Sequence, residues 1–232
     1  MIDFHSHVLP KMDDGSRSCA ESAAMLRESY AQGIDILAAT SHFYANENSP
    51  EEFLRRRARS WERLSEVLTD DMPAIRLGAE VQYFEGICRV CEIDLLRLEG
   101  SQVLLLEMPF CEWSSRMVKD VLDLNRRPDY TVLLAHIERY LQWQPEEVWQ
   151  ELRDEGVLMQ SNPSFFLNRK TRRRALKMLK YGEVDLLGSD CHNMNTRPPE
   201  LEGAFRLILE KIGQGEIRRI NTLGISLLED EG

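Results

Sequence analysis

Every histidine in this chain lies at the end of a short apolar run. The five histidines are His5, His7, His42, His136 and His192. Carboxylates occupy equivalent places, and they are Asp14, Glu80, Glu107 and Asp190. A lone histidine is most often a structural residue, but five histidines sorted in this way, together with carboxylates, indicate a polynuclear metal site. Nitrogen and oxygen donors without thiolate suit manganese, iron or zinc, and disfavour a structural zinc or an iron–sulfur cluster.

The first two histidines, His5 and His7, are separated by a single residue. Side chains at positions i and i+2 of a β-strand project to the same face. If residues 1–7 form a strand, both imidazole rings can therefore point at one ion.

Short β-rich runs alternate with longer helical segments along the chain. The expected strands are Met1–His7, Ile34–Thr40, Ile75–Glu80, Val103–Met108, Tyr130–Ala135, Val157–Gln160 and Val184–Gly188. They are mostly continuous apolar runs, as in strands that are buried on both faces. Capping signals at Ser18 and Ser49 open two helices, of which the first closes at Gly33 and the second runs to about Leu68. Further helices are expected at Ser115–Leu124, Pro145–Glu155, Arg169–Tyr181 and Leu201–Ile212.

This alternation predicts an α/β fold with a parallel sheet and right-handed crossovers. Seven strands with helices between them fit a (β/α)7 barrel better than an open sheet. No linker interrupts the pattern, so we expect one domain over residues 1–232. Parallel α/β folds place their sites at the carboxyl ends of the strands, where the histidines and carboxylates would meet.

Composition restricts the classes of function. The chain has 29 basic and 39 acidic residues, a net charge of −10, which argues against a general nucleic-acid binder. No apolar run approaches the ~18 residues of a membrane span. The first residues lack the basic and apolar regions of a signal peptide, so we expect a cytoplasmic protein without membrane insertion.

Seven segments carry a resemblance to a known superfamily. They are MIDFHSHVLPKMDDGS, ATSHFY, GAEVQY, LLLEMP, LAHIERY, SNPSFF and GSDCHNMNTRPP, spread from residue 1 to about residue 199. The chain resembles the PHP (polymerase and histidinol phosphatase) superfamily of metal-dependent phosphoesterases. Within it, the chain is most similar to the manganese-dependent protein-tyrosine phosphatases of bacterial capsule and exopolysaccharide operons. It departs from the commoner patterns at Thr40-Ser41-His42-Phe43, where one of two histidines remains at the ligand position, and in HIERY, but neither change removes an expected metal ligand.

The resemblance implies a distorted seven-stranded barrel that holds up to three metal ions, most often manganese, with iron or zinc as alternatives. The first ion would be bound by His5, His7, Glu80 and Asp190. The second would share Glu80 as a bridge and add Glu107 and His136. The third would be bound by Asp14, His42 and His192.

The resemblance also implies an activity. The expected reaction is hydrolysis of phosphotyrosine by a hydroxide held between two metals, on a bacterial tyrosine autokinase that controls capsule or exopolysaccharide synthesis. Arg139 follows His136 by three residues and Arg197 follows His192 by five, so both start near the site. Their placement in the matching motifs implies that they contact the phosphoryl oxygens. No residue is identified as a general acid.

Alternative functions remain open. The chain could be another phosphoesterase of the superfamily, such as a histidinol-phosphate or small phosphomonoester hydrolase, or a metal-binding scaffold for a kinase. Cys191-x5-Arg197 also matches the spacing of cysteine-dependent tyrosine phosphatases, but it lacks the glycines that such a phosphate loop needs.

Two further patterns have a structural and a functional interpretation. The Cys88-x-x-Cys91 pair lacks the second pair of ligands that zinc requires, and two ordinary helix cysteines are the simpler interpretation. The basic run Arg169–Arg174 is either a solvated helix face or a surface that attracts an acidic, phosphotyrosine-bearing tail.

Overall fold

The computed structural model describes residues 1–228 of the chain. Its strands are β1 (Ile2–Ser6), β2 (Ile36–Ala39), β3 (His42–Phe43), β4 (Ala74–Leu77), β5 (Glu80–Gln82), β6 (Val103–Glu107), β7 (Thr131–Leu134), β8 (Leu158–Ser161) and β9 (Leu186–Leu187). Its α-helices are α1 (Cys19–Ala31), α2 (Pro50–Ser65), α3 (Ser115–Asn125), α4 (Glu146–Asp154), α5 (Pro163–Leu167), α6 (Arg172–Lys180), α7 (Leu201–Lys211) and α8 (Gln214–Leu228). Short 3₁₀ turns are η1 (Ile87–Arg89), η2 (Cys91–Leu96) and η3 (Ile137–Arg139).

All paired strands are parallel, as the alternation of strands and helices predicts. They form a three-stranded sheet, β1-β2-β4, and a six-stranded sheet, β3-β5-β6-β7-β8-β9. The end of β1 is also joined to the segment after β9, because Asp190 N donates to His5 O at 2.7 Å and His7 N donates to Cys191 O at 2.9 Å. The fold is therefore α/β with parallel strands, arranged as two sheets that meet at β1.

The expected set of seven strands differs from the structure at two places. The third expected strand, Ile75–Glu80, is interrupted at residues 78–79 and becomes β4 and β5. The second, Ile34–Thr40, corresponds to β2 and is followed, after an interruption at residues 40–41, by the unpredicted strand β3. Both interruptions lie side by side, where Glu80 N is shared between the carbonyl oxygens of Thr40 and Ser41 at 3.1 Å each. Gly78 is needed there, because a Cβ at this position would lie 2.4 Å from Leu98 Cδ2. The bend changes the direction of the chain just before His42 and Glu80.

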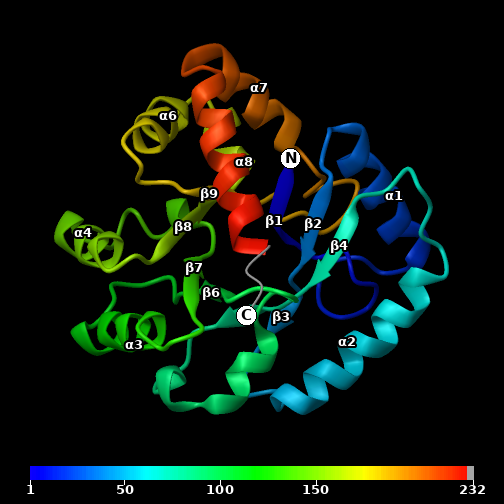
Figure 1. Cartoon of the computed structure of the whole chain (residues 1–232), viewed down its shortest axis with the longest axis horizontal. Helices are drawn as coiled ribbons and strands as arrows, with labels where there is room; N and C mark the ends of the chain where they lie inside the picture. Colours follow the sequence, from blue (N-terminus) through cyan, green and yellow to red (C-terminus); the bar gives the residue numbers. More distant parts are fainter. Residues whose placement is uncertain (229–232) are drawn as a thin grey trace.

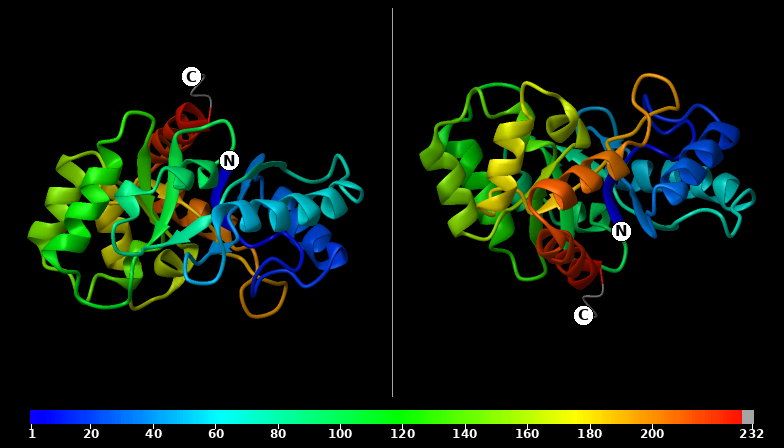
Figure 2. Two further views of the ribbon diagram at one scale, coloured as in Figure 1. Left: turned by 90° about the horizontal axis from the view of Figure 1, so that it is seen from below. Right: turned by 90° about the horizontal axis from the view of Figure 1, so that it is seen from above.

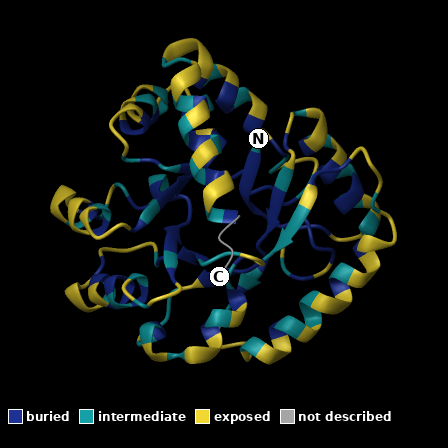
Figure 3. Ribbon diagram, in the orientation of Figure 1, coloured by how far each residue is buried: buried dark blue, intermediate teal, exposed yellow. Residues whose placement is uncertain are grey.

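Helices surround the strands. Helices α1 and α2 lie to one side and α3 and α4 to the other, with the strands between them (Figures 1 and 2). Most strand residues are buried, whereas β4 is only partly buried, and the exposed residues lie mainly on the outer faces of the helices and in the loops (Figure 3). All five residues of β6, Val-Leu-Leu-Leu-Glu, are buried, which explains its continuous apolar sequence.

Most expected helices occur with ends shifted by one to three residues. The first opens as expected, since Ser18 Oγ accepts a hydrogen bond from Glu21 N at 3.2 Å. The helix expected from Arg169 begins later, at Arg172, because the Asn168 side chain accepts a hydrogen bond from Lys170 N and holds these residues in a turn.

Helix α8 was not predicted. Its buried residues Ile217, Ile220, Gly224 and Leu228 follow a helical spacing, but no strong capping residue marks its start. It packs on β1, where a Cβ at Gly224 would lie 2.9 Å from a ring carbon of Phe4. The loops that follow β1 and β9 extend away from α8, so the carboxyl ends of the strands lie at the other end of the molecule (Figure 2). Within residues 1–228, no helix combines the length and apolarity that crossing a membrane requires.

Candidate metal centre

The structure brings together all nine residues that the sequence singles out as metal ligands. They come from the carboxyl ends of the strands or the segments that follow: His5, His7 and Asp14 from β1, His42 after β2 as the first residue of β3, Glu80 after β4 as the first residue of β5, Glu107 from β6, His136 from β7, and Asp190 and His192 from β9. Seven of them are buried, His42 is partly buried and only the Asp14 side chain is largely exposed, at 66%. Buried donors from so many separate strands form one compact cluster.

Glu80 lies at the middle of this cluster. Its Oε2 is 3.2 Å from Nε2 of His5 and 3.4 Å from Nε2 of His7. The same oxygen is 2.9 Å from Nδ1 of His42, and Oε1 is 2.9 Å from Nε2 of His136. One carboxylate therefore faces four imidazoles, which is the position that a bridging ligand would occupy.

Ligand atoms within 4.8 Å of one another fall into three groups. These are His5, His7 and Asp190; His42, Glu80 and Glu107; and His7, Asp14, His42 and His192. His136 lies beside the second group, with Nε2 3.4 Å from Glu107 Oε1. The groups overlap with the three predicted ligand sets but differ in detail, because His7 and His42 each belong to two groups, Glu80 to only one and His136 to none.

Several atoms of the cluster are buried without a hydrogen-bond partner. They are His42 Nδ1, Glu80 Oε2 and His192 Nε2. The first two lie 2.9 Å apart, and His192 Nε2 lies 3.3 Å from Asp14 Oδ1, but neither pair has hydrogen-bonding geometry. Leaving a buried polar atom unpaired costs ~1–3 kcal/mol, so three such atoms aimed at the same space are a costly arrangement for a bare protein. Lone pairs that converge in this way are what a cation requires, and the residues present therefore fit bound metal ions.

The electrostatics of the cluster agree with this interpretation. Burial alone would raise the pKa of Glu80, but His5 and the neighbouring histidines hold that pKa well below its usual value. Burial opposes a charge on His136, yet hydrogen bonds to Glu107 and Glu80 raise its pKa to about 9. At His192, burial and nearby cationic groups lower the pKa to about 4. The carboxylates thus attract protons to some imidazoles, and a metal would replace those protons.

The two predicted arginines converge on one carboxylate. Nη2 of Arg197 lies 2.6 Å from Asp190 Oδ1, and Nη2 of Arg139 pairs with Asp190 Oδ2. Each arginine side chain is 36% exposed, so it borders both the cluster and solvent. A cavity of about 150 Å³ lies beside Arg139, Asp190 and Arg197.

Comparison with known proteins identifies the family. Residues 1–224 match the family described as "Capsular polysaccharide synthesis, CpsB/CapC". The chain belongs to the CpsB/CapC family. Tyrosine-protein phosphatase CpsB of Streptococcus pneumoniae is 31% identical over 232 residues, covering 95% of this chain and 94% of that protein. Tyrosine-protein phosphatase YwqE of Bacillus subtilis is 26% identical, covering 92% of this chain and 85% of that protein. These matches confirm the resemblance to the capsule tyrosine phosphatases.

Solved structures agree on the fold. A crystal structure described with YwqE of Bacillus subtilis and CpsB of Streptococcus pneumoniae as "unique metal-dependent tyrosine phosphatases" superposes with a TM-score of 0.85 at 24% identity, covering 100% of this chain and 96% of that one. A D-hydantoinase from Thermus sp. superposes with a TM-score of 0.54 at 11% identity, covering 94% of this chain and 67% of that one. The CpsB/CapC fold of this chain thus shares its arrangement of strands with a metal-dependent phosphatase and, more distantly, with an amidohydrolase.

A set of supporting residues around the cluster was not predicted from the sequence. Asp13 Oδ2 lies 2.8 Å from His7 Nδ1, and Tyr140 Oη lies 3.2 Å from His136 Nδ1. Gln160 Oε1 lies 3.2 Å from Nδ1 of His5 and accepts a hydrogen bond from His136 N at 2.8 Å. These contacts fix the ring orientations of three candidate ligands and leave Nε2 of each ring facing the cluster.

One more supporting residue, Asn162, donates to Asp190 Oδ2 at 2.9 Å. The sequence pattern places Asn162 at a strand end but assigns it no role. Its position next to the expected sixth strand was the available signal, whereas Gln160 and Tyr140 resemble ordinary core residues in sequence.

The backbone of the centre is constrained as well. His136 and Asp190 adopt left-handed φ values of 32° and 52°, which non-glycine residues rarely do. Gly15 and Gly188 are required by close approach, because their added Cβ atoms would lie 2.5 Å from the Cβ atoms of His7 and His5, respectively. The loops are therefore packed directly against the candidate ligands.

Cys191 does not have the properties of a nucleophile. It is completely buried, and burial together with the nearby Asp3 carboxylate raises the pKa of its thiol to about 12. A thiolate is consequently disfavoured at neutral pH. The Cys88 and Cys91 pair lies in η1 and η2, and among the described residues neither cysteine joins a cluster of potential metal ligands.

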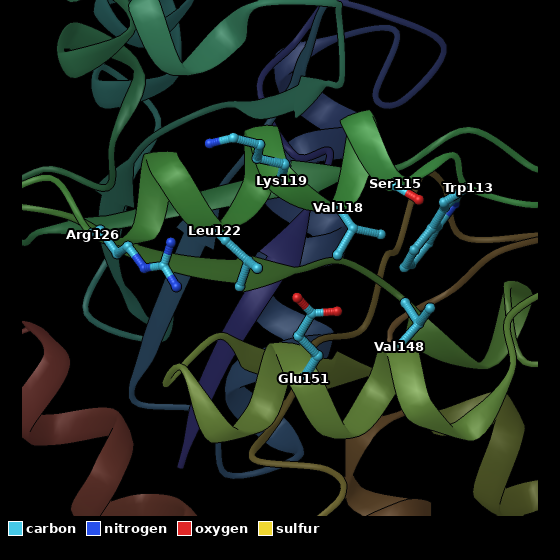
Figure 4. Close-up of a pocket in the computed structure, with 8 residues that line it drawn as sticks. All are labelled: Trp113, Ser115, Val118, Lys119, Leu122, Arg126, Val148 and Glu151. Carbon is cyan, nitrogen blue, oxygen red and sulfur yellow. The ribbon is translucent and has the colours of Figure 1, made fainter.

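A second hollow of about 330 Å³ lies between α3 and α4. Figure 4 shows Trp113, Val118 and Leu122 facing Val148 and Glu151 across it. None of the nine candidate metal ligands lines this groove, so it is separate from the centre.

Proposed function

We propose that this member of the CpsB/CapC family is a metal-dependent protein-tyrosine phosphatase. Its substrate would be phosphotyrosine on a bacterial tyrosine autokinase that controls capsule or exopolysaccharide synthesis. The observation that carries the proposal is the convergence of five histidines and four carboxylates, with buried unpaired donors, in a chain 31% identical to a tyrosine-protein phosphatase.

We assign the ligands as the family resemblance implies. His5, His7, Glu80 and Asp190 would bind one ion; Glu80, Glu107 and His136 a second; and Asp14, His42 and His192 a third. Manganese is our choice of metal, since the donors are imidazoles and carboxylates without thiolate; iron and zinc are the alternatives.

When bound, the metals would supply Lewis acidity and lower the pKa of an attacking water. The remaining work falls to residues of the chain. Arg139 and Arg197 would bind the phosphoryl oxygens and neutralise charge as it develops, which their planar guanidinium groups favour. Their present contacts with Asp190 hold both groups at the border of the centre. The leaving phenolate has a pKa near ~10, so it needs less protonation than an alkoxide would.

The setting of the activity is part of the proposal. We propose one domain over residues 1–232, of which 229–232 lie outside the described residues. Counting β2 with β3 and β4 with β5 as single strand positions gives the seven positions of a distorted barrel. A cytoplasmic location would place this domain with the kinase.

The test compares substrates on defined metals. Protein stripped with a chelator would be assayed with a phosphotyrosine peptide, histidinol phosphate and p-nitrophenyl phosphate after adding back manganese, iron or zinc. We expect no activity without metal, restoration by manganese, and kcat/KM highest for the peptide. A preference for histidinol phosphate would instead indicate the small-substrate alternative, and no hydrolysis at all with a full metal complement would indicate a scaffold.

The substitution Glu80→Gln tests whether the central carboxylate is needed for activity. It removes the charge that faces four imidazoles, and we expect it to lower kcat/KM by at least ~100-fold. Asp185→Asn is the control, because Asp185 is a carboxylate that accepts a hydrogen bond from Met159 N at the opposite ends of the strands. Equal effects of the two substitutions would contradict the assignment of Glu80.

A further inference from the structure

A large cavity of about 570 Å³ lies next to the candidate metal centre. It is formed by η3 and the residues after it, by α5, and by the start of α6. Its polar lining includes Arg139, Gln142, Ser164, Asn168, Lys170 and Arg174. These elements follow β7 and β8, so the cavity opens at the same ends of the strands as the metal centre.

The basic run Arg169–Arg174 divides into residues with different roles. Arg172 is structural, because its Nε and Nη2 donate to the carbonyl oxygens of Phe166 and Leu167 at 3.2 and 3.0 Å. Lys170 and Arg174 line the cavity, and both are exposed. Within residues 1–228, neither makes an ion pair with a carboxylate, so their charges are not neutralised locally.

The cavity is therefore positive in a chain whose net charge is −10. Glu138 is its one acidic lining residue. The carboxylate of Glu138 accepts hydrogen bonds from Ser161 Oγ at 3.0 Å and from Asn162 N at 3.3 Å, which direct it toward β8. Arg139 is paired with Asp190, but among the described residues Lys170 and Arg174 are two cations without an ion-pair partner against one restrained carboxylate, which leaves a net attraction for anions.

Arg139 connects this cavity to the metal centre. It lines the large cavity and also the smaller one that contains Asp190 and Arg197. A peptide bound with its phosphate at the centre would meet the large cavity on the other side of Arg139. An extended peptide advances ~3.3 Å per residue and alternates its side chains, so residues within a few positions of the phosphotyrosine can reach it.

We propose that the cavity lined by Lys170 and Arg174 is an anion-binding subsite for the substrate chain. It binds an acidic group on the segment that flanks the phosphotyrosine, either a carboxylate or a second phosphate. The inference rests on the proposed function and adds the substrate feature that distinguishes a peptide from a small aryl phosphate.

The test removes the two charges without changing the metal centre. Lys170→Gln with Arg174→Gln would be compared with Arg173→Gln with Lys180→Gln, a control that removes two charges from α6 but leaves the lining of the cavity unchanged. Substrates would be phosphotyrosine peptides with neutral flanks, with aspartates at positions −3 to +3, and with a second phosphotyrosine, alongside p-nitrophenyl phosphate.

We expect the cavity variant to raise KM about threefold to tenfold for the acidic and doubly phosphorylated peptides, since ion pairs at partly exposed sites are individually weak. KM for the neutral peptide and p-nitrophenyl phosphate should not change, and the difference should shrink at high salt. The carboxylate and phosphate peptides separate the two sources of the anion. Equal effects on all substrates, or equal effects of the control variant, would overturn the inference.

A measurement on the unmodified protein keeps the inference testable if the variants fold poorly. Unphosphorylated acidic and neutral peptides would compete with p-nitrophenyl phosphate cleavage by the metal-loaded protein at low salt. Subsite binding predicts weaker competition by the neutral peptide, and identical competition would contradict it. A protein that cleaves p-nitrophenyl phosphate and phosphotyrosine peptides but ignores flanking charge retains the proposed function and loses the subsite. A protein that cleaves neither substrate loses the proposed function.

Discussion

Asp13→Asn is the substitution that tests the organisation of the centre most directly. Asp13 binds no ion in the proposed ligand sets, but its side chain is only 5% exposed and accepts three hydrogen bonds. The donors are His7 Nδ1 at 2.8 Å, His42 N at 2.9 Å and Gly15 N at 3.0 Å. Accepting from Nδ1 fixes the tautomer of His7 that leaves Nε2 free to bind metal.

Asparagine has one acceptor oxygen where aspartate has two. If that oxygen keeps the bond to Gly15 N, the new amide group faces the N–H donors of His7 and His42. If it turns around, Gly15 N loses its partner. Either way, at least one buried donor is unpaired, which costs ~1–3 kcal/mol. Loss of an orienting carboxylate lowers metal affinity ~10–100-fold, or about 1.4–2.7 kcal/mol, so the two estimates agree.

The assay is activity against free Mn²⁺ concentration, after stripping with a chelator, with a phosphotyrosine peptide as substrate. We expect the Mn²⁺ concentration for half-activation to rise ~10–100-fold while kcat at saturating metal stays within a few-fold of the original. Asp120→Asn is the control, because Asp120 is equally buried and accepts hydrogen bonds from Tyr83 Oη at 2.8 Å and Gly86 N at 3.0 Å, away from the centre. Asp120→Asn should lower Tm without changing the Mn²⁺ concentration for half-activation.

Two results would refute this reasoning. If Asp13→Asn leaves the Mn²⁺ concentration for half-activation unchanged, the contact with His7 does not orient the ring for metal binding. If the Mn²⁺ concentration for half-activation is unchanged but kcat at saturating Mn²⁺ is lost, Asp13 acts in the reaction itself.

Three further substitutions test other parts of the structure. Gly188→Ala would place a Cβ 2.5 Å from that of His5, so we expect thermal melts to show a loss of ~1–3 kcal/mol of stability and metal titrations to show weaker binding. Gly215→Ala is the control, because its added Cβ would have no atom within 4 Å, and it should change neither property. Cys191→Ala should retain kcat for the phosphotyrosine peptide, since the thiol pKa is about 12; inactivity with full metal content would restore the thiolate mechanism. Burial raises the pKa of Asp3 from 3.8 to about 6, so in metal-free protein its contribution to stability is full below pH 4 and is lost as the pH rises to 6. Asp3→Asn should therefore match the original near pH 4 and exceed it by about 3 kcal/mol above pH 6, and parallel pH profiles in denaturant melts would contradict this.

The alternation of parallel strands and helices can be predicted from the hydrophobic pattern of the sequence. Continuous apolar runs such as 103–108 must be buried on both faces, and helices between them force parallel strands. The interruptions at residues 40–41 and 78–79 could not be inferred in the same way, because they depend on two neighbouring segments bending together. Helix α8 was missed because its apolar residues are widely spaced and its partner, Phe4, is far away in the chain.

At the candidate metal centre, the sequence predicted which end of the strands the polar residues occupy, but not which side chains contact one another. Parallel strands share one direction, so polar residues that follow them meet at one end whatever their side-chain conformations. The pairing of both Arg139 and Arg197 with Asp190 depends on how the segment after β7 and the segment after β9 lie relative to one another. Spacing along the chain indicates only how far each arginine lies from His136 or His192.

The difference between ligands and supporting residues has an energetic origin. Imidazoles and carboxylates gathered at buried strand ends leave atoms such as Glu80 Oε2 and His192 Nε2 unpaired, an arrangement that a folded chain tolerates where a cation binds. Such a pattern is rare in chains without metal sites, and for this reason it is informative in the amino-acid sequence alone. Gln160 and Tyr140, by contrast, satisfy their hydrogen bonds within the protein, as buried polar residues usually do. Nothing in their sequence positions distinguishes them from core residues, so the residues that aim the ligands become visible only when the distances to the histidines are measured.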